Sequence, residues 1–290
     1  MRTLTRFAIA VLAQLAVAAA QVASAADPPV LRVALLPDEN PANILRINEP
    51  LKGYLERALA RKIELVVTTD YSSMIEAMRF GKIDAGYFGP LSYVLLRQKV
   101  GDAVVPFAAK LENGSPTYRS VIIAGKTSGV RALADVRGKA MAYGDPASTS
   151  SHLIPKQMLL QEAGLKAGAD YTEHFAGAHD AVAMAVQNGH AQAGGLSQPI
   201  FESLVERKLV GADRVQVIAT SKPYPNYPWA VRTALDPALR EKLVLAFLEL
   251  KDPAVLRPIK AEGFGRIADG DYDVIRDMVR LLNLDLAKAK

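Results

Sequence analysis

Residues Tyr143–Pro155 read YGDPASTSSHLIP and continue from a short apolar strand at Ala140–Tyr143. The turn Gly144–Pro146 leads into four consecutive hydroxyl residues and an apolar run with helical spacing, so a helix is expected from Ser150 on; the hydroxyl residues are Ser148, Thr149, Ser150 and Ser151. Serine and threonine favour a helix start because their side chains accept hydrogen bonds from its unpaired amides, and one of them suffices as a cap. Several hydroxyls beside free amides indicate a site for an anion with many oxygens, with a hydroxyl-rich turn as the alternative.

The first 25 residues differ in composition from the rest of the chain. Arg2 and Arg6 precede an apolar run over 7–20, and the small residues 23–25 supply a cleavage site. This is the arrangement of a secretory signal peptide, and the apolar run is too short for a comfortable membrane span. We therefore expect residues 1–25 to be a signal peptide that is cleaved near Ala25, and the mature protein to be exported to the periplasm.

The rest of the composition is that of an ordinary globular protein, with 50% hydrophobic and 22% charged residues in a chain of 290. Removing Arg2 and Arg6 lowers the formal net charge from +5 to +3, because residues 1–25 contain no acid. Lysine and arginine are scattered along the chain, which argues against nucleic-acid binding. The chain has no cysteine, so it has neither a disulfide nor the thiol of a bacterial lipid anchor. We expect a free periplasmic monomer.

Apolar strands alternate with helical patterns along the mature chain, which predicts an α/β fold with mostly parallel sheets covered by helices. The expected strands are 31–36, 63–67, 83–88, 103–109, 119–124, 140–143, 172–175, 191–195, 215–219 and 229–232. After Asp236 the chain is expected to be helical, with breaks at Pro253, Pro258 and 263–270. The pattern forms two similar units joined near 110–118 and 222–229. It predicts one lobe of 26–118 plus 229–290, a second of 119–228, and a ligand cleft where the C-terminal strand ends face each other.

The sequence lacks the motifs of common enzyme and metal sites. Gly125-Lys126-Thr127 mimics the end of a phosphate-binding loop, but Ser120 stands where that loop needs its first glycine. The four histidines (152, 174, 179 and 190) lie outside any HExxH or CxxC pattern, and no GxSxG nucleophile elbow occurs. We therefore expect a protein that is not an enzyme and that holds no metal or cofactor.

Three further polar side chains are expected at strand ends or at the first crossover. Tyr71 stands at a strand-to-helix turn, Tyr118 lies beside the crossover, and His179 lies where a helix should begin. Ligands of open α/β sheets bind at such positions. The alternative for Tyr71 is a packed aromatic ring, and the alternative for Tyr118 is a simple interlobe spacer. The alternative for His179 is a solvent-exposed residue at a helix start.

Three blocks of the chain resemble one known family, and the similarity runs through most of the mature chain. The blocks are DYSSMIEAMRFGKIDAGYFGPLSYVL (Asp70–Leu95), TYRSVIIA (Thr117–Ala124) and DPASTSSHLIP (Asp145–Pro155). They resemble the phosphonate-binding, PhnD-like periplasmic proteins of ABC transporters. The resemblance implies a type II periplasmic binding-protein fold, with two α/β lobes joined by two crossover strands. It also implies that a phosphorus oxyanion with a P–C or P–H bond is held by Tyr71, Tyr118, Ser148, Thr149, Ser150 and His179.

The resemblance also bears on the cargo. In relatives that take 2-aminoethylphosphonate, carboxylates in the second lobe and the second crossover hold the ammonium group. The corresponding stretches here, GGLSQP (Gly194–Pro199) and YPNYPW (Tyr224–Trp229), contain no acidic residue. A buried ammonium without a carboxylate is poorly compensated. We therefore expect phosphite, hypophosphite or methylphosphonate as the ligand, with Tyr227 closing over the space of an amine tail.

The expected function is capture of this anion and its delivery to an inner-membrane ABC permease with its ATPase. Closure of the lobes would signal occupancy to the permease. The alternatives are a protein that binds 2-aminoethylphosphonate, a periplasmic sensor that docks on a membrane receptor, and an exported enzyme with the same fold. The enzyme is disfavoured because no paired acid and base is expected in the cleft.

Overall fold

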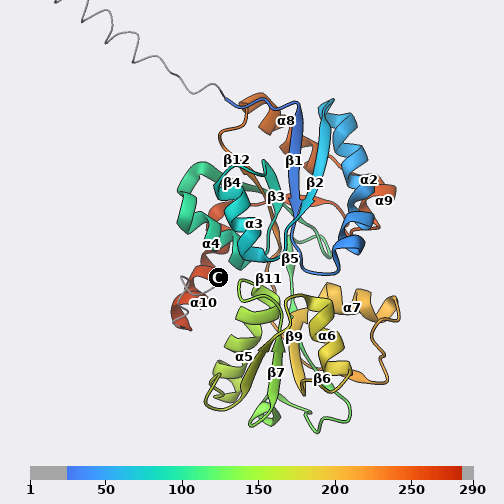
Figure 1. Cartoon of the computed structure of the whole chain (residues 1–290), viewed down its shortest axis with the longest axis vertical. Helices are drawn as coiled ribbons and strands as arrows, with labels where there is room; N and C mark the ends of the chain where they lie inside the picture. The colour runs from blue at the N-terminus through green and yellow to red at the C-terminus, as the bar shows by residue number, and fades with distance from the viewer. Residues whose placement is uncertain (1–24, 283–290) are drawn as a thin grey trace, which may run out of the picture.

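A computed structural model describes residues 25–282 of the chain. The expected signal peptide falls almost wholly on residues 1–24, which lie outside the described residues. Within the described part, no helix has the length and apolar character needed to cross a membrane. Figure 1 shows two α/β bodies, one above the other, with the chain passing between them.

The upper body in Figure 1 is built on a mixed sheet with the strand order β13-β4-β12-β3-β1-β2. Its strands are β1 (Val30–Leu35), β2 (Lys62–Val67), β3 (Ala85–Tyr87), β4 (Val104–Lys110), β12 (Pro228–Arg232) and β13 (Phe264–Arg266). Strand β1 is parallel to β2 and β3, whereas β12 is antiparallel to β3 and β4. Strand β12 follows the return of the chain from the other body.

The lower body repeats this plan with the strand order β10-β6-β9-β7-β8. Its strands are β6 (Ser120–Gly125), β7 (Ala140–Tyr143), β8 (Thr172–Phe175), β9 (Ala193–Ser197) and β10 (Val215–Thr220). Strand β7 is parallel to β8 and β9, whereas β6, the first strand after the chain leaves the upper body, is antiparallel to β9 and β10. In both sheets an antiparallel strand that follows a crossover is therefore inserted among the others.

Helices cover both sheets and begin beyond the C-terminal ends of strands (Figure 1). The α-helices are α2 (Pro41–Leu59), α3 (Tyr71–Arg79), α4 (Pro90–Val100), α5 (Ile154–Ala163), α6 (His179–Gln187), α7 (Gln198–Glu206), α8 (Pro237–Leu248), α9 (Pro253–Leu256) and α10 (Asp273–Leu281). The shorter turns are η1 (Gly101–Ala103), η2 (Leu133–Val136), the π-helical η3 (Thr149–Leu153) and η4 (Asp269–Tyr272).

Two short strands connect the bodies and pair with each other. They are β5 (Thr117–Tyr118) and β11 (Tyr224–Pro225), and their antiparallel register sets Tyr224 opposite Tyr118. The first crossing runs between β4 and β6, and the second between β10 and β12. The division of the chain at 118/119 and 228/229 stays our prediction for the limits of the lobes.

Three expectations from the sequence are wrong in detail. The segment after Asp236 contains the edge strand β13, which pairs antiparallel with β4; its three residues, FGR, are too few for an alternating pattern. The sheets are mixed rather than mostly parallel, because inserted strands such as β12 cannot be placed from local pattern. The helix expected from Ser150 begins at Thr149, as a π-helical turn.

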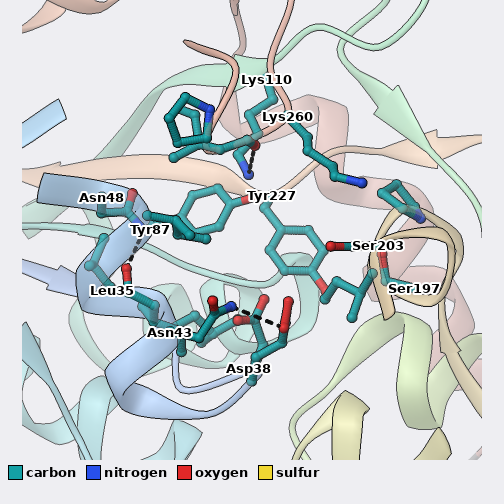
Figure 2. Close-up of a pocket in the computed structure, with 18 of the residues that line it drawn as sticks. Leu35, Asp38, Asn43, Asn48, Tyr87, Lys110, Ser197, Ser203, Tyr227 and Lys260 are labelled. Carbon is teal, nitrogen blue, oxygen red and sulfur yellow. Dashed lines mark hydrogen bonds between the residues drawn. The ribbon is translucent and has the colours of Figure 1, made fainter. Parts of the chain in front are cut away.

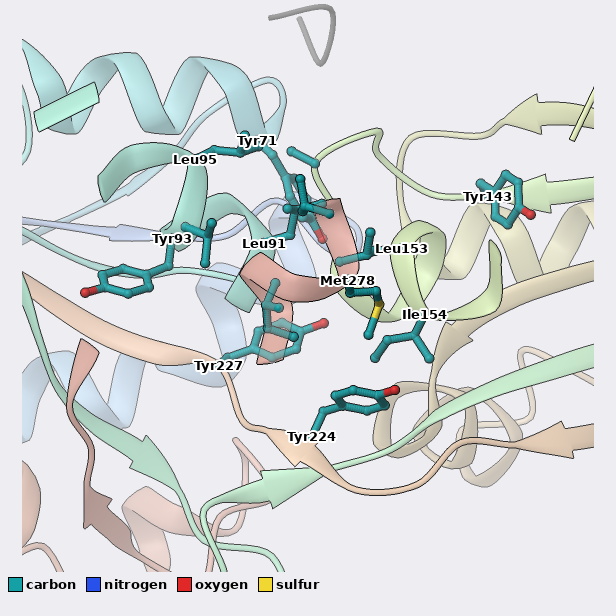
Figure 3. Packing of buried hydrophobic residues seen from close by; sticks show 14 of the residues in the cluster. Tyr71, Leu91, Tyr93, Leu95, Tyr143, Leu153, Ile154, Tyr224, Tyr227 and Met278 are labelled. Carbon is teal, nitrogen blue, oxygen red and sulfur yellow. The ribbon is translucent and has the colours of Figure 1, made fainter. Parts of the chain in front are cut away.

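A buried apolar cluster spans the junction between the two bodies (Figure 3). It joins Tyr71 and Leu91 of the upper body to Leu153 and Ile154 of the lower body, and Met278 of α10 belongs to it. Helix α10 packs on α4 and also contacts η3. Because burying a methionine side chain contributes about 1.5–3 kcal/mol, the last described helix helps to hold the junction together.

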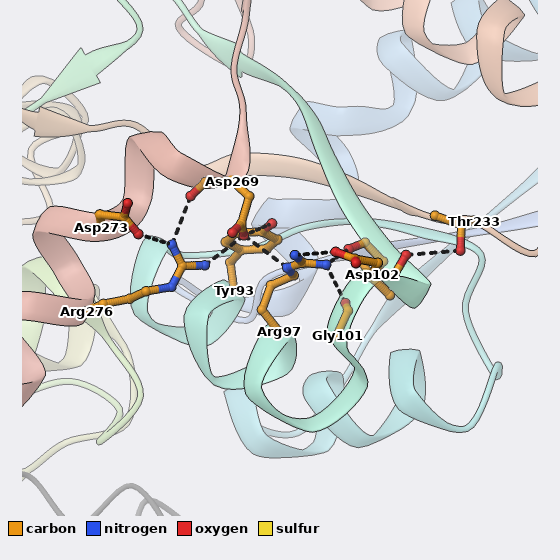
Figure 4. Close-up of polar contacts among 9 residues, drawn as sticks. Tyr93, Arg97, Gly101, Asp102, Thr233, Asp269, Asp273 and Arg276 are labelled. Atoms are coloured by element: carbon orange, nitrogen blue, oxygen red, sulfur yellow. Dashed lines mark hydrogen bonds and ion pairs between the residues drawn. The ribbon is translucent and has the colours of Figure 1, made fainter.

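A charged network fixes the segment that leads into α10 (Figure 4). Asp269 Oδ1 accepts hydrogen bonds from three side chains: Tyr93 Oη at 2.7 Å, Arg97 Nε at 3.0 Å and Arg276 Nη2 at 2.7 Å. Burial tends to raise the pKa of Asp269, but these contacts outweigh it and hold the pKa below its usual value. Tyr272 Oη donates to Asn226 O at 2.8 Å, so the same segment supports the second crossover.

Candidate anion-binding site

Helices α3, α4, η3–α5 and α6 all begin at the junction between the two bodies. Tyr71 is the first residue of α3, Leu91 lies in the first turn of α4, Thr149 opens η3, and His179 opens α6. The βα connections cause this arrangement, because each helix starts beyond the C-terminal end of the preceding strand. Helix N-termini carry free amides and partial positive charge, so the junction favours an anion.

Ser148, Thr149 and Ser150, here called the hydroxyl cradle, are 0–2% exposed. Ser148 Oγ is the helix cap, because it accepts a hydrogen bond from the amide of Ser151 at 3.2 Å. Thr149 Oγ1 accepts from Leu91 N at 2.7 Å, and Ser150 Oγ lies 3.3 Å from Tyr227 Oη. Capping thus accounts for one hydroxyl of the cradle and leaves the other two turned toward groups of the opposite body and of the crossover.

Ser151, which sequence reasoning left out of the site, fixes the turn that presents the cradle. Its Oγ donates to Gly195 O at 2.5 Å and accepts from Gly144 N at 2.8 Å. Its carbonyl oxygen also accepts from Gly144 N, at 3.0 Å. In an α-helix that carbonyl would bind the amide of residue 155, but Pro155 has none. The opening turn is accordingly π-helical, a form that is common at functional sites.

His179 is completely buried, so the alternative of a solvent-exposed residue does not hold. The amide of Ser197 donates to His179 Nδ1 at 3.0 Å. The neutral ring therefore carries its proton on Nε2. Burial lowers the pKa of His179 to about 3, so the ring is neutral at neutral pH. Within residues 25–282 the buried Nε2 has no hydrogen-bond partner, which makes Nε2–H a donor available to a ligand.

Two buried tyrosine hydroxyls are also unpaired in the described part of the chain, those of Tyr71 and Tyr118. Tyr71 Oη lies near Ser148, and Tyr118 Oη lies near Thr149 and Ser150. Burial raises the pKa of both phenols, so both remain protonated donors. Packing alone does not account for them, because a buried unpaired hydroxyl costs about 1–3 kcal/mol and phenylalanine would fill the same space.

Tyr71→Phe is expected to weaken binding of methylphosphonate about tenfold or more, while the free energy of unfolding without ligand stays equal or rises. The change removes a hydroxyl that has no protein partner, so it costs nothing unless an anion uses it. Calorimetric titration and denaturant unfolding measure the two effects. The matched control is Tyr143→Phe, which breaks a 2.8 Å bond to Tyr171 Oη and should lower stability without changing affinity. Unchanged affinity in Tyr71→Phe would exclude its hydroxyl from the site.

Acid is expected to destabilise the protein through two buried histidines. Burial lowers the pKa of His152 to about 4 and that of His179 to about 3, whereas an unfolded histidine titrates near about 6.5. Below about pH 6.5 the unfolded chain therefore binds protons that the folded chain does not. Each histidine then lowers the free energy of unfolding, by about 2 kcal/mol at about pH 5.

NMR titration and denaturant unfolding at several pH values check this prediction. Neither imidazole should protonate in the folded protein above about pH 5, and His152→Gln should flatten the pH dependence of unfolding. Burial raises the pKa of Asp38 to about 7, so Asp38 changes the free energy of unfolding with pH in the opposite direction to the histidines. Comparing His152→Gln with the wild type isolates the contribution of the histidine. An ordinary pKa for His179 in the folded protein would contradict its placement as a neutral donor.

Direct contacts hold the two bodies together around the cradle. Besides Leu91 N, three main-chain amides donate across the junction: Tyr71 N to Asp145 Oδ2 at 3.2 Å, His179 N to Asp38 O at 2.9 Å, and Asn40 N to Asp180 Oδ2 at 3.0 Å. Two ion pairs also cross it, Glu39 with Arg207 and Glu206 with Lys260. The bodies are therefore in contact, and the unpaired donors face an enclosed junction.

An interlobe cavity of about 580 Å³ lies beside the cradle (Figure 2). Tyr118, Tyr227 and Ser197 line it, although the three cradle hydroxyls do not. The aromatic rings of Tyr118 and Tyr227 meet edge to face at 5.1 Å between centroids. Tyr227 thus lines the cavity and also contacts the cradle through its hydroxyl.

Charged residues that sequence reasoning missed also line this cavity: Asp38, Glu39, Arg46, Lys110, Glu112, Glu206, Arg207 and Lys260. Gly194–Pro199 and Tyr224–Trp229 hold no acid, but carboxylates enter the cavity from the β1–α2 loop and from the first crossover. Asp38 and Glu39 follow the C-terminal end of β1, the same kind of position that identified Tyr71 after β2. No local sequence signal marks Glu112 as a cavity residue, because its position at the cavity depends on the path of the first crossover.

Comparison with known proteins identifies the family. Residues 33–272 match the sequence model of the family described as "ABC transporter, phosphonate, periplasmic substrate-binding protein". The chain belongs to this family. Its members are binding proteins rather than enzymes, and family membership places the protein in the periplasm.

Individual relatives agree with this family. The chain is 28% identical over 275 residues to "Phosphate-import protein PhnD" of Mycolicibacterium smegmatis, covering 86% of this chain and 84% of that one. It is 26% identical over 223 residues to the "Phosphonates-binding periplasmic protein" of Escherichia coli, covering 75% and 65%. The structure of PhnD1 from Prochlorococcus marinus in complex with methylphosphonate superposes with a TM-score of 0.81 at 21% identity, covering 89% of this chain and 99% of that one. The expected type II periplasmic binding-protein fold is confirmed.

Proposed function

We propose that this protein is the solute-binding component of an ABC transporter that imports a reduced phosphorus oxyanion, namely phosphite, hypophosphite or a small phosphonate such as methylphosphonate. One observation carries the proposal: three buried donors without protein partners, on Tyr71, Tyr118 and His179, occur at the junction that also holds the hydroxyl cradle. Neutral donors and helix N-termini pair a buried anion without the desolvation cost of a lysine or arginine.

The closed surroundings of the cradle support a small head group. The residues of the cradle are nearly inaccessible, and the hydroxyl of Tyr227 lies 3.3 Å from Ser150 Oγ. The nearby carboxylate of Asp145 is already engaged, since its two oxygens accept the amides of Ala147 and Tyr71. A related protein of the same fold, PhnD1 of Prochlorococcus marinus, was crystallised with methylphosphonate.

Calorimetric titration of the mature, ligand-stripped protein tests the proposal with phosphite, hypophosphite, methylphosphonate, 2-aminoethylphosphonate and phosphate. Phosphate carries a hydroxyl where phosphite carries hydrogen, and leaving that hydroxyl unpaired costs about 1–3 kcal/mol. Tight binding of a P–H or P–C anion with weaker phosphate binding is expected. Tighter binding of phosphate would overturn the reduced-phosphorus cargo, and the name of the Mycolicibacterium relative makes this comparison necessary.

A second cargo, 2-aminoethylphosphonate, is favoured by a specific observation. Asp38 and Glu112 line the cavity next to Tyr118 and Tyr227, so carboxylates are available to an ammonium within reach of the junction. If 2-aminoethylphosphonate binds more tightly than methylphosphonate in the same titration, 2-aminoethylphosphonate replaces the small reduced phosphorus anion as the proposed cargo.

We further propose that the protein works as a monomer, cleaved near Ala25, that delivers its ligand to an inner-membrane permease and ATPase. Family membership supports transport over the alternative of a sensor docked on a membrane receptor. Deletion of the gene should abolish periplasm-dependent uptake of the bound anion while the response to phosphorus starvation is kept. Loss of that response with normal uptake would favour the sensor.

A further inference from the structure

The charged groups around the interlobe cavity fall into two sets. Glu39 is paired with Arg207 at 2.8 Å, and Glu206 is paired with Lys260, so these four charges are neutralised within the protein across the junction. Asp38, Arg46, Lys110 and Glu112 form no ion pair among the described residues, although all four line the cavity; the Arg46 guanidinium donates a hydrogen bond to Asn43 Oδ1 at 2.7 Å. These groups therefore face the cavity rather than a protein partner.

Lys110 has unused hydrogen-bonding capacity. Its ammonium lies 4.8 Å from the ring centroid of Tyr87 and donates one hydrogen bond, to Ile259 O at 3.1 Å. A lysine ammonium has three donors. Burial lowers the pKa of Lys110 because solvent does not stabilise its charge, and the nearby carboxylates offset this in part.

Asp38 has even fewer partners than Lys110. Within residues 25–282 its carboxylate accepts no side-chain or main-chain hydrogen bond from another residue, and Figure 2 shows it entering the cavity from the side opposite Lys110. Glu112 has one partner, Asn226 Nδ2 at 3.0 Å. Beside the exposed guanidinium of Arg46, the cavity thus presents two incompletely satisfied carboxylates and one incompletely satisfied ammonium.

Two residues link the cavity to the cradle and to His179. Tyr227 lines the cavity and contacts Ser150 Oγ at 3.3 Å, and Ser197 lines it while its amide binds His179 Nδ1. A volume of about 580 Å³ falls within the usual range for small-molecule pockets, about 300–1,000 Å³. A methyl group or a hydrogen on phosphorus uses little of it.

We propose that the interlobe cavity is a tail subsite for phosphonates that carry an ammonium and a carboxylate, with Asp38 and Glu112 binding the ammonium and Lys110 binding the carboxylate. The inference rests on the proposed function, because the phosphorus group still occupies the cradle. A tail with an ammonium alone is a poorer match, since it competes with Lys110 for the same carboxylates. A carboxylate on the tail gives Lys110 its own partner and removes that competition.

Calorimetric titration with four compounds tests each charge separately: methylphosphonate, 2-aminoethylphosphonate, 3-phosphonopropionate and 2-amino-3-phosphonopropionate. The last, which has both charges, is expected to bind about tenfold or more tightly than methylphosphonate. Asp38→Asn should weaken the two ammonium compounds about tenfold, and Lys110→Met should weaken the two carboxylate compounds about tenfold. Each variant is compared with the wild type by the ratio of these affinities to its own affinity for methylphosphonate, and thermal unfolding without ligand shows whether the variant is folded.

Exposed residues supply controls for net charge. Asp213→Asn and Lys126→Met change the charge by the same amounts at exposed residues that do not line the cavity, and they should leave all four affinities unchanged. Methylphosphonate binding without any gain from the charged tail would overturn this inference and leave the proposed function intact. Failure of every phosphorus compound to bind would overturn the proposed function itself.

Discussion

Thr149→Ala is expected to lower the affinity for methylphosphonate about 100-fold or more, with little change in the fold of either body. Thr149 Oγ1 accepts the amide of Leu91 at 2.7 Å from the opposite body, and the threonine is 2% exposed. Alanine would leave that amide buried without its acceptor, which costs about 1–3 kcal/mol, and would also remove one hydroxyl from the anion. Both losses fall on the junction between the bodies rather than on the core of either one, so binding suffers more than folding.

The control for this change is Thr149→Ser, which keeps the hydroxyl and removes a methyl group. It should retain most of the affinity, within about tenfold, because the acceptor for Leu91 N is still present. Titration calorimetry gives the affinities, and thermal unfolding of the ligand-free proteins shows whether the fold is kept. If Thr149→Ala binds as tightly as the wild type, Thr149 is a bystander, since Ser148 already caps the helix.

Gly195→Ala is expected to damage stability and binding together. A Cβ on Gly195 would lie 2.3 Å from Cγ and 2.7 Å from Cβ of Pro155, which sits in the first turn of α5. The proline ring cannot rotate out of the way, so strand β9 and the opening of α5 must separate. Such overpacking costs about 1–3 kcal/mol or more. Because Gly195 O also accepts Ser151 Oγ at 2.5 Å, the separation would displace the turn that presents the cradle.

Thermal unfolding and methylphosphonate titration check this prediction, with Gly53→Ala as the matched control. Gly53 lies inside α2, where an added Cβ would meet Arg57 at an ordinary 3.6 Å. There alanine should raise stability by up to about 1 kcal/mol, because glycine is a poor helix former. A Gly195→Ala protein with unchanged melting temperature and affinity would show that the strand and helix are not as tightly apposed as described.

Local pattern predicted the regular elements of this fold better than their assembly. The apolar runs of the parallel strands and the helix from Asp236-Pro237 were recognisable, because each signal lies within a few neighbouring residues. Strand β13 was missed, since three residues carry no period and its pairing with β4 is a tertiary event. The insertion of β12 between β3 and β4 was likewise invisible, because direction and neighbours in a sheet depend on the path of the whole chain.

In the candidate site, too, residues with a local sequence signal were predicted and residues placed by the tertiary fold were missed. The hydroxyl stretch, Tyr71 and His179 were found because each stands next to a helix start, which is a local property. The charges of the cavity were missed, because Asp38 and Glu112 are 74 positions apart and meet only when two loops converge. Even the correct reading of the acid-free stretches did not exclude an ammonium partner, since the structure brings carboxylates from elsewhere.

Within residues 25–282, four contacts across the junction use a main-chain amide as their donor, those of Asn40, Tyr71, Leu91 and His179. A main-chain N–H is present whatever side chain the position carries, provided that it is not proline. The donor groups of these four contacts therefore remain when the side chains of their residues are replaced. An engineer who wishes to retarget the protein can exchange Asp38, Lys110 or Glu112 freely and still keep these donors. The scaffold thus separates the recognition of a cargo from the act of enclosing it.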